Sequence, residues 1–170
     1  MSVTLDEAFA QIKFELAKSY QTFTEDNFGR FIGLDEALAD VTSSFSSDYE
    51  DAQEPPSGVF PGSQQSLRVY QVALGIVPQD SFNPVTIDEA LAQVRYELAR
   101  SYQDFAFGYG DPMTLEQGYV EVRKGYLNGA AEAGYSMSDD NPFEADGVWP
   151  GLEQVLRVYG EAFKVDPYQV

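Results

Sequence analysis

The 170-residue chain contains no cysteine and no histidine. Disulfide bonds, thiol catalysis, zinc sites built from cysteine or histidine, and all histidine-based triads are therefore excluded. A Glu-x-x-His di-iron motif is excluded for the same reason. Catalysis would have to rely on paired carboxylates, a lysine nucleophile, a serine with a lysine base, or a metal held by oxygen atoms.

Basic residues are also scarce, with 10 Lys and Arg against 28 Asp and Glu, which gives a net charge of −18. Direct binding to nucleic acid is not expected, because contacts to phosphates need Lys and Arg. The chain has no run of about 18 apolar residues, so membrane insertion is not expected either. The acidic N-terminus lacks the basic and apolar regions of a signal peptide, and a cytoplasmic location is the expectation.

Catalytic and cofactor-binding motifs are absent from the sequence as well. It has no glycine-rich phosphate loop between a strand and a helix, and no Ser-x-x-Lys element. With 28 acidic residues, some pair will meet a catalytic carboxylate spacing by accident. The sequence therefore predicts no catalytic residue, no metal site and no cofactor, and an enzyme that uses carboxylates is kept only as an alternative.

The sequence contains three blocks that occur twice in the same order. Residues 3–23 (VTLDEAFAQIKFELAKSYQTF) match residues 85–105 (VTIDEALAQVRYELARSYQDF). Residues 34–41 match 115–122, and GVFPGSQQSLRVYQ at 58–71 matches GVWPGLEQVLRVYG at 147–160. Three ordered matches indicate a tandem duplication, with repeats at 1–83 and 84–170.

Each block predicts a helix. Thr4 with Glu7, and Thr86 with Glu89, are capping-box patterns. Apolar residues follow at steps of three and four, which is helical spacing, up to Phe23 and Phe105. The predicted fold is all-α: a pseudo-two-fold bundle of about six main helices, made from two three-helix units packed as one compact domain.

Six of the ten basic residues recur in pairs and are expected to have structural roles; they are Lys13 with Arg95, Lys18 with Arg100, and Arg68 with Arg157. Glu15 with Lys18, and Glu97 with Arg100, have the spacing of charge pairs on a solvated helix surface. Arg68 and Arg157 are expected to pair with an acidic residue of another helix. Tyr70 and Tyr159 are expected in the core, with the hydroxyl at its edge.

Two acidic loops precede the third block of each repeat and contain the candidate partner-binding residues. Three interpretations are open: solvated loops that aid solubility, a divalent cation site without EF-hand spacing, or docking surfaces for a basic partner. The aromatic residue before Pro-Gly is either an interface anchor or a plug of its own three-helix unit. The candidate residues are Asp48, Glu50, Asp51, Glu54, Phe60, Asp139, Asp140, Glu144, Asp146 and Trp149.

These features favour a non-catalytic protein–protein interaction module, such as an adaptor, an assembly factor or a subunit of a larger complex. Its partner would be a protein with a basic patch, because charge complementarity steers association and gives specificity. An alternative is a DNA mimic that inhibits a nucleic-acid-binding protein. Basic residues interrupt the first helix of each repeat, which weakens that alternative. The sequence does not define an oligomeric state.

Overall fold

The computed structural model describes residues 3–46, 55–127, 148 and 150–164, and these residues form six helices. The helices are α1 (Leu5–Phe28), α2 (Leu34–Ser46), α3 (Ser63–Ala73), α4 (Ile87–Gly108), α5 (Leu115–Leu127) and α7 (Leu152–Phe163). The described part of the chain contains no β-strand, only an isolated bridge between Ser57 and Phe60. The predicted all-α class is confirmed.

The two long helices begin at the predicted capping boxes. The Thr4 hydroxyl accepts a hydrogen bond from the Glu7 backbone N–H, and the Glu7 carboxylate accepts one from the Thr4 N–H. Thr86 and Glu89 repeat this arrangement at the start of α4. These bonds satisfy backbone donors that have no partner inside the helix, so the start of each helix is fixed by local sequence.

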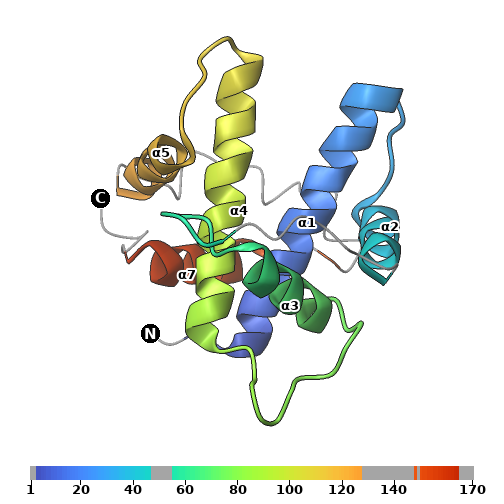
Figure 1. The fold of residues 1–170 in the computed structure, drawn as a ribbon. Coiled ribbons are helices and arrows are strands. Elements are labelled where there is room, and N and C mark those ends of the chain that lie inside the picture. The colour runs from blue at the N-terminus through green and yellow to red at the C-terminus, as the bar shows by residue number, and fades with distance from the viewer. Residues whose placement is uncertain (1–2, 47–54, 128–147, 149, 165–170) are drawn as a thin grey trace.

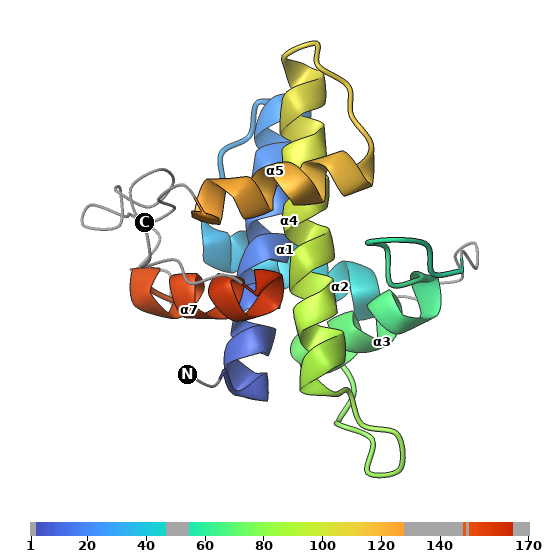
Figure 2. The same ribbon diagram turned by 90° about the vertical axis from the view of Figure 1, so that its left-hand side faces the viewer.

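The long helices α1 and α4 pack against each other and form the centre of the molecule (Figure 1). The shorter α2 packs on α1, and α5 packs on α4. Helices α3 and α7 lie on opposite sides of the α1–α4 pair, and each contacts both long helices (Figure 2). The upper ends of α1 and α4 diverge and extend beyond α3 and α7.

Small residues allow the helices to approach closely. Ala8 and Ala17 on α1, and Ala90 and Ala99 on α4, are completely buried. A Cβ atom added at Gly118 on α5 would lie 2.6 Å from the Ala99 carbonyl oxygen, closer than such contacts occur. The close packing of α5 on α4 therefore requires a glycine at this position.

An ion pair joins the third helix of each half to the first helix of the other half. Arg68 on α3 forms an ion pair with Glu89 on α4, and Arg157 on α7 forms an ion pair with Glu7 on α1. Both predicted interhelical ion pairs are thus confirmed. The two halves therefore exchange contacts through residues at matching positions of the repeated blocks.

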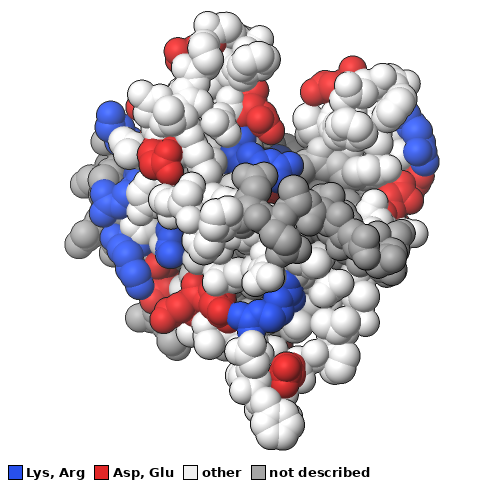
Figure 3. Space-filling view, viewed as in Figure 1, with Lys and Arg blue, Asp and Glu red and all other residues white. Residues whose placement is uncertain are grey.

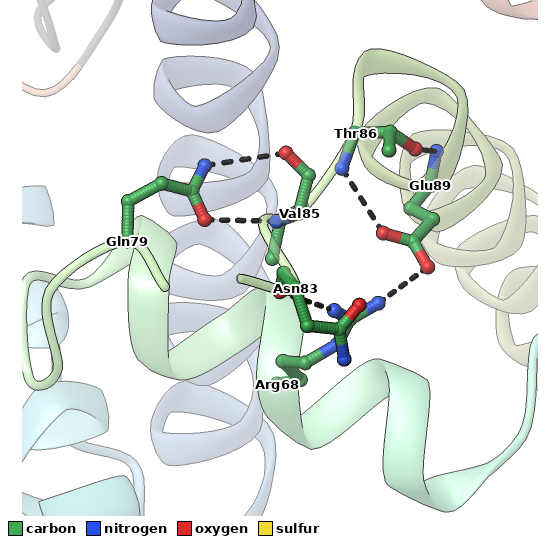
Figure 4. A network of polar contacts seen from close by, with 6 residues as sticks. All are labelled: Arg68, Gln79, Asn83, Val85, Thr86 and Glu89. Carbon is green, nitrogen blue, oxygen red and sulfur yellow. Dashed lines mark hydrogen bonds and ion pairs between the residues drawn. The ribbon is translucent and has the colours of Figure 1, made fainter. Parts of the chain in front are cut away.

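The linker between the halves is also held by side chains (Figure 4). Arg68 donates a hydrogen bond of 3.0 Å to the Asn83 carbonyl. The Gln79 amide donates to the Val85 carbonyl and accepts from the Val85 N–H, at 3.2 and 2.8 Å. A pocket of about 350 Å³ lies beside this network, between α3 and the linker. These hydrogen bonds, which we call the linker clamp, fix the direction in which the chain enters α4.

Arginines from two other helices bind the C-terminal end of α7. Arg95 on α4 donates a hydrogen bond of 2.8 Å to the Ala162 carbonyl, and Arg123 on α5 donates one of 3.1 Å to the Phe163 carbonyl. The last carbonyls of a helix lack intrahelical partners and form its negative end, so cations are favourable there. Arg95 therefore has the structural role expected from its recurrence.

Among the described residues, none of the helices combines the length and the apolar character needed to cross a bilayer.

Candidate protein interface

Nine of the ten candidate partner-binding residues lie outside the described residues. They are Asp48, Glu50, Asp51, Glu54, Asp139, Asp140, Glu144, Asp146 and Trp149. The tenth, Phe60, is half-buried, and its ring centroid lies 5.2 Å from that of Tyr96 on α4. One of the two interpretations from the sequence was a plug of its own three-helix unit, but Phe60 contacts the first helix of the other half.

The turn before Phe60 is tightly fixed. Ser57 and Phe60 exchange two backbone hydrogen bonds of 3.0 Å each. The Val59 N–H donates to the Glu116 carboxylate on α5 at 3.3 Å. Gly58 has φ of 56°, and a Cβ there would overlap a Glu116 carboxylate oxygen. This segment of the first half is therefore built against the second half.

A buried polar network joins α1 to α7. Glu15 is only 3% exposed, and its carboxylate accepts hydrogen bonds from the Tyr159 hydroxyl and, at 2.8 Å, from the Gln11 amide. The Gln11 amide also donates to the Tyr159 oxygen at 3.0 Å. Buried polar groups are stable only when they are bonded in this way. The network anchors the third helix of the second half to the first half.

The corresponding residues of the other half form a second network. Glu97 is 2% exposed and accepts hydrogen bonds from the Tyr70 hydroxyl and, at 2.9 Å, from the Gln93 amide. The Gln93 amide also donates to the Tyr70 oxygen at 2.9 Å. The networks connect α3 to α4 and α7 to α1, so both cross between the halves. They lie in the interior and offer no surface to a partner.

These networks correct two predictions from the sequence. Glu15 and Glu97 are core residues, not solvated surface charges, because α7 and α3 cover them. The Arg100 guanidinium nevertheless interacts with the Glu97 carboxyl, as the spacing predicts. The hydroxyls of Tyr70 and Tyr159 point to these buried carboxyls, not to the edge of the core. The sequence did contain a signal: Gln and Glu recur, four residues apart, at matching positions of both repeats.

Burial raises the pKa of Glu97, while the Arg100 guanidinium and the bonds from Tyr70 and Gln93 partly oppose this shift. The protonated form is therefore favoured by the folded state. In the unfolded chain the carboxyl has its ordinary pKa of 4.5. Between this value and the raised pKa, only the unfolded chain loses the proton, so the stability from Glu97 falls as pH rises.

We therefore expect Glu97→Gln to become more stable relative to the native protein as pH rises above about 4.5. The measurement is urea unfolding across a pH series. Glu25→Gln is the matched control, because it removes the same charge from an exposed position. A relative stability that changes with pH equally in both variants would mean that net charge, not burial of Glu97, causes the effect.

The upper end of α1, the turn after it and the start of α2 form the first tip (residues 23–36), which carries an exposed aromatic cluster. Phe23, Phe28 and Phe31 are 49%, 69% and 77% exposed. The rings of Phe23 and Phe28 lie edge to face with centroids 5.8 Å apart. Three exposed phenylalanines within nine residues are unusual on a protein surface, where such patches mark interaction sites.

The upper end of α4 carries a similar cluster, the second tip (residues 104–111). Phe105, Phe107 and Tyr109 are 58%, 72% and 79% exposed. The rings of Phe105 and Tyr109 have centroids 4.9 Å apart. Phe23 and Phe105 occupy matching positions of the repeated block, whereas the other aromatics are placed differently on the two tips.

The exposure of Phe23 and Phe105 corrects their assignment to the buried helix stripe. Periodicity places both residues on the apolar face, but it does not show how far a covering helix extends. The helix α1 has 24 residues, whereas α2 has 13 and α3 has 11. At about 1.5 Å per residue, the shorter helices cannot cover the whole length of α1. Its aromatic end is therefore left uncovered.

Acidic side chains surround both tips. Glu25, Asp26 and Asp35 on the first tip, and Asp104 and Asp111 on the second, are exposed. Arg30 is the one basic residue between positions 19 and 36, and it forms an ion pair with Glu36. No Lys or Arg occurs between positions 101 and 122. Figure 3 shows the tips as two lobes, mostly white with red patches, separated by a notch, with blue patches at the base of the notch and on the outer side of one lobe.

Comparisons with known proteins add no relative: no protein-family model, no curated protein and no solved structure matches the chain.

Proposed function

We propose that this protein is a non-catalytic interaction module that binds a protein with a basic surface. The single observation that supports the proposal is the exposed apolar area at the two tips. Monomeric proteins rarely expose large clusters of aromatic side chains, and such patches are typical of binding sites. The two tips expose six such side chains. The surrounding acidic residues favour a partner that carries Lys and Arg, because opposite potentials steer association.

The test is affinity capture from a native lysate of the source organism. The immobilised full chain is loaded at low salt and eluted with a salt ramp, beside an unrelated protein of equal net charge. We expect a defined protein to elute from the native chain and not from the control. If both columns retain the same proteins, net charge explains the binding, and the proposal is wrong.

Charge reversal then separates the possible contact surfaces. One variant reverses Asp48, Glu50 and Asp51, a second reverses Asp139 and Asp140, and a third reverses Glu25 and Asp26 on the first tip. The variant that loses the captured protein identifies the contact. A captured DNA-binding protein that is displaced by duplex DNA would instead support the DNA-mimic alternative.

A further inference from the structure

We infer that the two tips form one composite docking surface, and that a single basic protein covers both aromatic clusters at once. The inference rests on the proposed function and specifies where and how the partner binds. It commits to a protein partner whose apolar contact sites are bordered by Lys and Arg. Three observations carry it: the apolar area of the tips, their fixed geometry and their charge.

The apolar area of one tip is too small for a stable complex. A fully exposed aromatic side chain presents roughly 200 Å², so the three aromatics of each tip expose about 400 Å². A stable interface buries about 800 Å² on each partner, of which a little more than half, about 450 Å², is apolar. One tip alone falls short of this apolar area, whereas the two tips together exceed it. The apolar area therefore favours a partner that contacts both tips.

The geometry of the tips is fixed before binding. The Gln21 amide donates a hydrogen bond of 2.7 Å to the Ile32 carbonyl, and Gln103 donates one of 3.0 Å to the Met113 carbonyl. These glutamines occupy matching positions of the repeats, and each ties its helix to the following turn. Gly29 ends α1 in the left-handed conformation, at φ of 60°. Preformed tips on two packed helices lose little entropy when a partner binds both.

The charge of the tips selects the kind of partner. Both tips lie at helix C-termini, where the helix dipole is negative and cations are favourable. Neither α1 nor α4 has a basic residue in its last turn, and each tip carries exposed carboxylates. A second copy of this chain would bring like charges together, and an anionic membrane surface would repel the tips. A protein with Lys and Arg around its apolar sites fits both features.

Photo-crosslinking tests where the partner binds. The photoreactive amino acid p-benzoylphenylalanine replaces Phe31 in one variant, Tyr109 in a second and Phe82 in a control. Phe82 is 97% exposed in the linker, and the linker lies at the opposite end of the molecule from both tips (Figure 1). We expect the same protein to crosslink from positions 31 and 109 but not from 82, through peptides that contain Lys or Arg. Different proteins at the two tips, or equal crosslinking at position 82, would overturn the inference.

Affinity measurements with the crosslinked protein test whether both tips bind at once. Phe28→Ser with Phe31→Ser disables the first tip, and Phe107→Ser with Tyr109→Ser disables the second. Linked sites typically gain 10²–10⁴-fold in affinity, so either variant should weaken binding by about 100-fold or more. Phe82→Ser should change it less than about twofold, and melting curves check that every variant is folded.

The remaining outcomes also decide the question. If the captured protein binds both tip variants as tightly as the native chain, the docking surface lies elsewhere and only the proposed function survives. If the native chain captures nothing above the control column, both proposals fail. Crosslinks of the tips to a second copy of the chain, or tip-dependent sedimentation with phosphatidylcholine vesicles, would assign the aromatics to dimerisation or to a membrane and overturn the inference.

Discussion

Replacing Phe163 by alanine should lower the free energy of unfolding by about 3–5 kcal/mol, the usual cost of removing a buried phenylalanine. Phe163 is fully buried at the end of α7, and its ring stacks on Tyr119 of α5 with centroids 5.2 Å apart. The cost includes the lost burial and the cavity that the fixed backbone cannot close. Arg95 and Arg123 hold the backbone at this point, so relaxation is limited.

The measurement is urea or thermal unfolding of Phe163→Ala beside Phe82→Ala. Phe82 is 97% exposed, so its replacement should change stability by less than about 0.5 kcal/mol. Natural proteins of this size are stable by about 5–15 kcal/mol, so the loss at Phe163 is a large share of the total. Equal stability of the two variants would contradict the burial of Phe163 at the end of α7.

The helices of this fold are predictable from the sequence because their signals are local. Thr4 and Glu7 lie three residues apart, and the bonds they form need no other part of the chain. The same holds for Thr114 and Gln117, whose capping hydrogen bonds begin α5. Helical periodicity likewise depends only on neighbouring residues. Local rules therefore locate the helices and set the all-α class.

The contacts between the halves are not predictable in this way. The spacing of Glu15 and Lys18 is that of a surface pair, and only the position of α7 shows that Glu15 is buried. The stripe that ends at Phe23 is that of a buried face, and only the length of the covering helices shows that Phe23 is exposed. Both errors have one cause: periodicity identifies a face, whereas packing decides what covers it.

The candidate interface was missed for the same reason. The sequence drew attention to clustered carboxylates before the Pro-Gly turns, because charge is visible in composition. The tips combine aromatics that look like core residues with acids spread along the helix ends. Both kinds of residue are exposed because the ends of α1 and α4 extend beyond the helices packed on them, which is a property of the assembled fold (Figure 1).

Cutting the linker should leave the two halves bound to each other. A protease site inserted between Ser81 and Phe82 lies in an exposed loop, and the cut would spare the linker clamp between Gln79 and Val85. Tyr70 and Tyr159 each reach a buried carboxyl of the opposite half, so neither half keeps its polar network when alone. After cleavage, we expect both fragments to elute together from a size-exclusion column with an unchanged helical circular dichroism spectrum.

Cleavage should nevertheless make stability depend on concentration. A short linker holds the two halves at an effective concentration near 1 mM. At 1 µM protein, the cut therefore lowers the concentration of one half at the other about a thousandfold, which costs roughly 4 kcal/mol of stability. The melting temperature of the cut protein should therefore rise with concentration, whereas that of the uncut insertion variant should not. With Tyr70→Ala and Tyr159→Ala, the cut fragments should separate, because each mutation removes a contact between the halves. Native fragments that separate and remain helical would show that each half folds independently, and would refute an interlocked core.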